Sequence, residues 1–144
     1  MIVVDVNLLL YAVVSGFRQH DAAHAWWEET LNGPAEVGLS SPAIFGFLRV
    51  STNPRILTSP LPVEAAVGHV TGWLDQPNVC FLAPGPRHLD IAFDLLHGMG
   101  TAGNLTTDVQ LAALAIEHNA DMCSNDNDFG RFHQLRWVNP LSSN

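Results

Sequence analysis

The chain has 144 residues, the usual length of one domain, and 47% of them are hydrophobic while 14% are charged, which excludes a disordered chain. Six basic residues against 14 acidic ones leave a net charge of −8, which excludes a polybasic surface for nucleic acid or membrane lipid. All six basic residues are arginine, so phosphate sites and Schiff-base enzymes that depend on lysine are excluded too. We expect one domain over residues 1–144.

The start of the chain lacks the features of a secretion signal. Residues 1–4 contain no basic side chain and are followed at once by the carboxylate of Asp5. A membrane-spanning helix needs about 20 consecutive apolar residues, and every apolar stretch of this sequence is much shorter. Cys80 and Cys123 lie far apart, each in an apolar run, which predicts two buried thiols in a reducing compartment. We therefore expect a cytoplasmic protein with no membrane contact.

Short hydrophobic runs bounded by polar or turn residues predict five strands. They lie at residues 1–4, 37–39, 78–82, 121–124 and 135–138. The first run is continuously apolar, which is typical of a strand buried on both faces of a parallel sheet.

Stretches with apolar residues at helical spacing predict six helices between these strands. They lie at residues 8–14, 21–31, about 41–51, 63–74, 87–97 and 108–118. We expect Asn7 to cap the first helix and Thr107 to cap the last. Residues 98–104 and 125–130 are expected to be loops. The alternation of strands and helices predicts an α/β fold with a mainly parallel sheet.

Four aspartates are placed to meet at one edge of this sheet. Asp5 ends the first strand, and Asp126 and Asp128 follow the fourth. Asp108 opens the helix that leads into the fourth strand, so it starts at the same edge. Taken singly, each has an ordinary structural explanation as a helix cap, a partner of the helix dipole or a turn residue.

Converging carboxylates repel one another unless a cation lies between them. Mg²⁺ prefers oxygen ligands and keeps several waters, and such ions bind the attacking and leaving oxygens of phosphodiesters. The pattern therefore predicts metal-assisted hydrolysis of a phosphate ester.

At these residues the sequence resembles the PIN-domain ribonucleases, and among them the VapC-type toxins of bacterial toxin–antitoxin pairs. The matching stretches, in chain order, are Val4-Asp5-Val6-Asn7-Leu8-Leu9, Gly46-Phe47-Leu48-Arg49-Val50 with Thr52-Asn53-Pro54-Arg55, Gly103-Asn104-Leu105 to Asp108, Leu111-Ala112-Ala113-Leu114-Ala115, and Ser124-Asn125-Asp126-Asn127-Asp128-Phe129 to Arg136-Trp137. Each motif alone is weak, but their order over nearly the whole chain is specific.

The resemblance implies a PIN-like α/β/α sandwich with a short, mainly parallel central sheet. It also implies a Mg²⁺-dependent endoribonuclease, with Mn²⁺ as a substitute, that arrests translation and growth, forms a homodimer and is inhibited by a small antitoxin protein. The family's metal carboxylates map onto Asp5, Asp108 and Asp126, with Asp128 as a plausible fourth catalytic carboxylate, and Asn7 and Thr107 match supporting polar positions.

One departure from the family pattern concerns the predicted third helix. Many members carry a glutamate early in this helix, where the present chain has Gly46 within Phe45-Gly46-Phe47-Leu48-Arg49. A subset of the family shares this Gly-Phe-Leu-Arg pattern. The change removes one metal ligand, leaves open whether one or two ions bind, and raises the question of whether Asp128 compensates.

The evidence for a functional role is weaker for the other polar and aromatic residues. Arg49 and Arg55 flank a turn and either hold RNA phosphates or pair with carboxylates of the fold. His20 and His24 share a helix face, but no third metal ligand has a readable spacing. The tryptophans on the predicted helices are expected in the core or in a dimer interface.

Two other classes of protein share part of this pattern with the nucleases. Haloacid-dehalogenase-like phosphatases and response-regulator receivers also place an aspartate at a strand end. The phosphatases need a second aspartate where Asn7 stands, and both need a lysine that the chain lacks. The second class, a catalytically weak PIN-like regulator that binds RNA or an antitoxin without cleavage, stays open at this point.

Overall fold

Five parallel strands form one sheet in the order β3-β2-β1-β4-β5 in the computed structural model, which describes residues 1–100 and 103–142. The strands are β1 (Ile2–Val4), β2 (Val37–Ser40), β3 (Val79–Leu82), β4 (Asp121–Cys123) and β5 (Trp137–Val138). Each one falls within a predicted strand or extends it by a single residue, and the predicted α/β class with a parallel sheet is confirmed.

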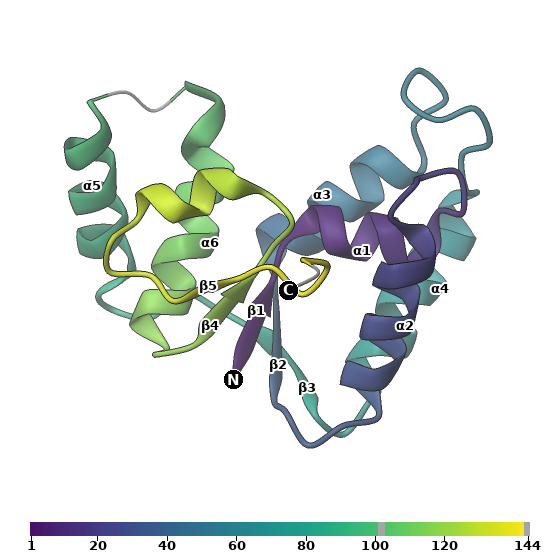
Figure 1. Cartoon of the computed structure of the whole chain (residues 1–144), viewed down its shortest axis with the longest axis horizontal. Helices are drawn as coiled ribbons and strands as arrows, with labels where there is room; N and C mark the ends of the chain where they lie inside the picture. The colour runs from purple at the N-terminus through teal and green to yellow at the C-terminus, as the bar shows by residue number, and fades with distance from the viewer. Residues whose placement is uncertain (101–102, 143–144) are drawn as a thin grey trace.

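Six α-helices surround the sheet (Figure 1). They are α1 (Val6–Val13), α2 (His20–Leu31), α3 (Ser41–Ser51), α4 (Val63–Leu74), α5 (His88–Met99) and α6 (Thr106–Glu117), with short 3₁₀ turns η1 (Gly103–Leu105) and η2 (Asn127–Arg131). In Figure 1, α5 and α6 lie together on the left and α1 to α4 on the right. None of the helices in the described ranges is long and apolar enough to cross a bilayer.

The central strand β1 fixes the position of the site. Val3 and Val4 are fully buried, as a continuously apolar strand predicts. Val4 is in register with Cys123 on β4, and the amide N–H of Asp5 donates to the Cys123 carbonyl at 3.0 Å. The residues that follow the two strands, Asp5 and Ser124, are therefore neighbours at the carboxyl edge of the sheet.

The two predicted helix caps are wrong, for local backbone reasons. The Asp5 carboxylate accepts the Val6 N–H at 2.7 Å, so Asp5 caps α1 and Asn7 lies inside the helix. At α6 the cap position is Leu105, with no side-chain cap, because the 3₁₀ turn η1 leads directly into the helix and Thr107 lies within its first turn. Most of the predicted loop at residues 125–130 is instead the 3₁₀ turn η2, which extends one residue beyond it to Arg131.

The prediction for the two cysteines is half right. Cys123 lies on an inner strand and is buried, whereas Cys80 is exposed because β3 is an edge strand whose two middle residues are both exposed. The tryptophan prediction is confirmed for the core: Trp27 and Trp73 are buried and meet edge to face with ring centroids 5.6 Å apart.

Candidate active site

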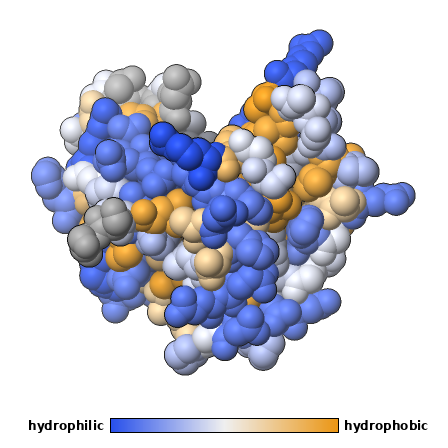
Figure 2. All heavy atoms as spheres, turned by 45° about the vertical axis from the view of Figure 1, so that its right-hand side comes forward, coloured by the Kyte–Doolittle hydropathy of each residue, from blue (hydrophilic) through white to orange (hydrophobic). Residues whose placement is uncertain are grey.

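Three of the predicted site carboxylates line one cavity of about 550 Å³. Asp5 comes from the start of α1, Asp108 from the first turn of α6 and Asp126 from the segment after β4. The cavity lies at the carboxyl edge of the sheet, toward the upper part of Figure 1, and Figure 2 shows the molecule hollowed on this upper side. The convergence expected from parallel-sheet topology is therefore present in the structure.

Asp5 is the most enclosed of these carboxylates, with 6% of its surface exposed. One carboxylate oxygen accepts the Val6 N–H at 2.7 Å, and the other accepts the Ser124 hydroxyl at 2.6 Å. Burial raises the pKa of Asp5, the two hydrogen bonds oppose that rise, and the nearby charge of Asp126 adds to it. Both oxygens thus have fixed partners before any ligand enters.

Ser124 connects the first carboxylate to the segment after β4. Its buried hydroxyl donates to Asp5, accepts the Asp126 N–H at 2.9 Å and accepts the Asn7 amide at 3.4 Å. The Asn7 side-chain oxygen in turn accepts the Asn125 N–H at 3.5 Å. Sequence reasoning gave Asn7 a supporting role but missed Ser124, although its position directly after an inner strand, like that of Asp5, was a usable signal.

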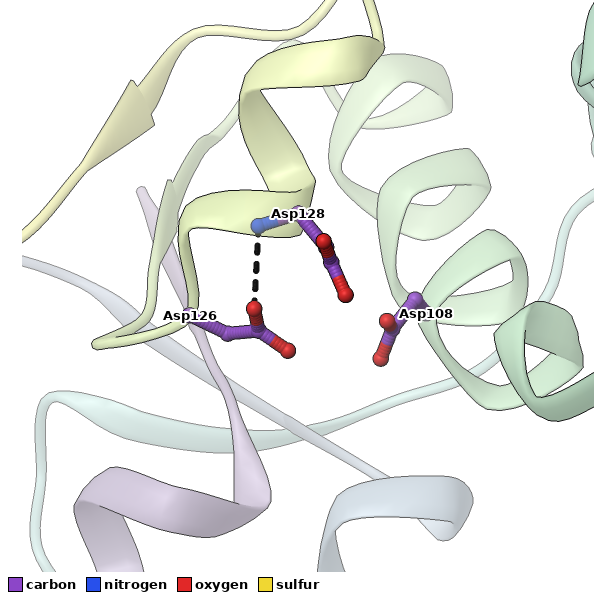
Figure 3. Close-up of side chains that lie close together, drawn as sticks. All are labelled: Asp108, Asp126 and Asp128. Carbon is purple, nitrogen blue, oxygen red and sulfur yellow. Dashed lines mark hydrogen bonds between the residues drawn. The ribbon is translucent and has the colours of Figure 1, made fainter.

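The tightest grouping of carboxylates consists of Asp108, Asp126 and Asp128. One oxygen from each lies within 4.8 Å of the other two, and among the described residues no other set of three or more histidine, cysteine or acidic side chains comes together in this way. Figure 3 shows Asp108 on α6 facing the two aspartates at the start of η2. The Asp126 carboxylate accepts the Asp128 N–H at 2.9 Å, which holds these two in fixed relation.

The structure thus arranges the four aspartates differently from the simplest sequence prediction. Asp5 shares the cavity with Asp108 and Asp126, but Asp128 rather than Asp5 completes the close grouping. Asp5 is more deeply buried, and its two oxygens accept hydrogen bonds from the Val6 N–H and the Ser124 hydroxyl.

The carboxylates affect one another's protonation. Burial, followed by the charges of Asp5, Asp126 and Asp128, raises the pKa of Asp108 to about 6. Burial and the charges of Asp5 and Asp126 also raise the pKa of the Tyr11 phenol. In the described ranges, Arg131 is the one basic residue paired with the group, through a contact of 3.4 Å to Asp128 with both side chains largely exposed. A divalent cation would neutralise the remaining repulsion, so the donor set fits such an ion.

The remaining predicted site residues fall into two groups. Arg49, Thr107 and Gly46 line the same cavity as the carboxylates. Arg55 does not line it and is exposed in the segment after α3. Neither Arg49 nor Arg55 forms an ion pair with a described carboxylate, so internal pairing does not occupy them.

His20 and His24 have a structural role at the end of α1. Their Nδ1 atoms lie 2.7 Å from the Tyr11 carbonyl oxygen and 3.1 Å from the Ala12 carbonyl oxygen. A carbonyl only accepts, so each Nδ1 carries the proton. These carbonyls belong to the last turn of α1, where backbone acceptors have no partner within the helix, so the two histidines tie α2 to that end of α1.

Comparison with known proteins agrees with this architecture. The PIN domain family model matches residues 2–135. Ribonuclease VapC33 of Mycobacterium tuberculosis is 57% identical over 141 residues, covering 98% of this chain and 99% of the relative.

Two solved structures share the fold at low sequence identity. VapBC-1 from nontypeable Haemophilus influenzae has a TM-score of 0.69 at 17% identity, covering 99% of this chain and 100% of that chain. VapC20 from M. tuberculosis, described as a sarcin-ricin loop cleaving toxin, has a TM-score of 0.63 at 16% identity, covering 94% of this chain and 99% of that chain. Since the family model spans most of the chain and the VapC33 match is nearly full length, this chain belongs to the PIN-domain family, among the VapC ribonucleases.

Proposed function

We propose that this protein is a Mg²⁺-dependent endoribonuclease that acts as the toxin of a type II toxin–antitoxin pair. The observation that carries the proposal is the grouping of three carboxylates within 4.8 Å in a cavity that Asp5 also lines. The relatives named ribonuclease VapC and the structural neighbour described as a sarcin-ricin loop cleaving toxin support RNA as the substrate. We place the activity in the cytoplasm, where RNA is available.

The carboxylates would hold a divalent cation. Asp5, Asp108 and Asp126 are the proposed metal residues, and Asp128 is a further carboxylate of the site that takes over part of the role of the glutamate absent at Gly46. When bound, such an ion lowers the pKa of a water and balances the charge that develops on a phosphodiester. Mn²⁺ is expected to substitute, because it also accepts oxygen ligands.

The chain's own residues position the reacting groups. Ser124 and Asn7 fix Asp5 and the segment carrying Asp126 through the hydrogen bonds described above. Arg49 lines the cavity and supplies a guanidinium that can pair with an RNA phosphate. Addition of water to phosphorus with breakage of the P–O3′ bond leaves a 5′-phosphate and a 3′-hydroxyl. Arg55, exposed on the neighbouring loop, is a second candidate for phosphate contact.

The proposed partners are an RNA substrate, a cognate small antitoxin and a second copy of the chain. The net charge of −8 and the carboxylate cavity favour an arginine from the antitoxin, which would take the place of the cation's charge. Antitoxin binding should therefore suppress Mn²⁺ binding in calorimetry. Unchanged Mn²⁺ affinity in the complex would contradict this occlusion.

Cleavage of total cellular RNA by the purified protein tests the nuclease proposal. Activity should require Mg²⁺ or Mn²⁺, stop with EDTA and yield 5′-phosphate ends that sequencing can map. Asp108→Asn should abolish it. Asp94→Asn on α5 is the matched control, because it removes the same charge from an exposed position outside the cavity. RNA binding without cleavage by the parent would instead support a regulator that binds RNA and does not cut it.

A further inference from the structure

A second cavity adjoins the carboxylate cleft. It has a volume of about 260 Å³ and lies between α3, the end of β3, α5 and α6. Pro42, Phe45 and Gln110 line both cavities, so they form the boundary between them. A polymer that lies in the cleft can therefore place one of its side groups in the second cavity without leaving the catalytic edge.

Phe45 presents an aromatic ring at this boundary. Its side chain is 65% exposed, although a phenylalanine of a packed helix is usually covered. Phe47, two positions further along α3, is fully buried. Phe47 therefore packs in the core, whereas the ring of Phe45 stays exposed. An uncovered ring beside a phosphodiester-binding cleft is suited to stacking on a nucleic-acid base.

His88 provides an independent sign that the cavity accepts a polar ligand. The residue is 8% exposed and lines the cavity, and its Nδ1 atom is fully shielded with no hydrogen-bond partner among the described residues. A buried polar atom without a partner is costly, and a shielded atom cannot reach a ligand, so pairing with the imidazole requires the ring to turn about its Cβ–Cγ bond when a polar group fills the site. Gln110 adds an amide that forms no hydrogen bond with described residues and offers both a donor and an acceptor.

The size and charge of the cavity select the kind of ligand. Drug-sized ligands occupy pockets of about 300–1,000 Å³, so a cavity of about 260 Å³ suits one ring system. None of the described lining residues is an acid, a lysine or an arginine, and the adjoining carboxylates disfavour a second anion. A neutral, planar group with hydrogen-bonding edges meets both conditions.

We propose that this cavity binds one unstacked base of the RNA next to the cleaved phosphodiester. Phe45 stacks on the base, and Gln110 and His88 hydrogen-bond to its edge, so that these residues set the base preference of cleavage. The inference rests on the proposed ribonuclease function and adds to it the position at which sequence is read.

Cleavage of a pool of single-stranded RNAs randomised around one site tests the inference. Phe45→Leu keeps an apolar side chain but removes the stacking face, and it should raise KM about tenfold, more than it changes kcat. Gln110→Ala and His88→Ala should flatten the base preference at one position and leave the other positions as in the parent. Phe81→Leu is the matched control, since Phe81 is an aromatic that is 57% exposed on β3 and lines neither cavity.

The outcomes distinguish a failure of the base pocket from a failure of the proposed ribonuclease function. If the parent cleaves RNA, and Phe45→Leu has the same KM and base preference as Phe81→Leu, the base pocket is wrong. The ribonuclease proposal is unaffected by that result. Absence of both RNA cleavage and RNA binding in the parent overturns the ribonuclease and the pocket together. Sedimentation of the same variants covers a third case: if Phe45→Leu only weakens self-association and the base profile is unchanged, Phe45 belongs to a subunit interface and the inference is wrong.

Discussion

A β-carbon at position 46 would lie 2.6 Å from Cγ2 of Val6, so α1 and α3 meet there at a distance that only glycine permits without movement. Gly46 also lines the carboxylate cavity. The position where the resemblance to the family predicts a glutamate therefore has no room for a β-carbon unless Val6, the first residue of α1, moves. The relationship makes Val6 and Gly46 a coupled pair.

The coupling predicts the behaviour of Gly46→Glu. The gain of about 0.5–1 kcal/mol in helix propensity should be outweighed by overpacking against Val6, which costs about 1–3 kcal/mol. Val6→Ala removes the clashing methyl groups and leaves the Val6 Cβ 3.5 Å from the new β-carbon, an ordinary contact. The double variant should therefore lose less free energy of unfolding than the two single variants lose in sum. Urea unfolding of the parent and the three variants would measure this. Strict additivity would contradict the coupling.

Asp5→Asn should abolish cleavage and leave the fold intact. The asparagine side-chain oxygen can still accept the Val6 N–H and cap α1, but the new NH2 group cannot accept the Ser124 hydroxyl as the lost oxygen does. Removal of a charge that burial disfavours offsets the loss of that hydrogen bond. We expect a free energy of unfolding close to that of the parent in the absence of metal. Asp5→Ala is the comparison, since loss of the cap costs about 0.5–2 kcal/mol. A folded Asp5→Asn protein with full activity would remove Asp5 from the site.

The raised pKa of Asp108, about 6, predicts two opposite dependences on pH. The folded metal-free protein holds this proton more tightly than the unfolded chain, whose aspartate pKa is about 3.9. Its contribution to stability is therefore full below about pH 4 and is lost as pH rises to about 6. Metal binding needs the ionised form, so Mn²⁺ affinity should rise over pH 5 to 7. Asp108→Asn should flatten the first trend in thermal unfolding, and an unaltered pH profile in that variant would contradict the assignment.

Asp128 and Arg131 should influence metal binding in opposite directions. Asp128→Ala removes one of the three grouped carboxylates and should weaken Mn²⁺ binding. Arg131→Ala removes the cation 3.4 Å from Asp128 and should strengthen it modestly, with little change in stability because the pair is exposed. Calorimetric titration of both variants checks the signs. Equal affinities in both variants and the parent would place Asp128 outside the metal site.

The two thiols should differ in reactivity. Burial raises the pKa of Cys123 to about 12, while Cys80 is exposed on the edge strand. Because the thiolate is the reactive form, iodoacetamide should label Cys80 in the native protein and reach Cys123 only after unfolding. Mass spectrometry of the labelled peptides decides the matter, and Cys80→Ser provides a control in which native labelling disappears. Native labelling of Cys123 would contradict its burial.

The sequence by itself determined the succession of strands and helices along the chain, the parallel sheet and the edge of the sheet at which the aspartates gather. These features follow from hydrophobic periodicity and from the rule that parallel strands end at the same side, both of which are local or topological. The apolar run before Asp5 and the helical pattern after Asp108 were sufficient for that conclusion.

Only the tertiary structure decided which side chains touch. The parallel register of β1 and β4 brings Ser124 against Asp5, across 119 positions of the chain. The first turn of α6 meets the start of η2, which groups Asp108 with Asp126 and Asp128. The closeness of α1 and α3 explains the glycine at position 46. These contacts depend on packing distances between elements remote in sequence, and periodicity along one chain segment carries no information about such distances.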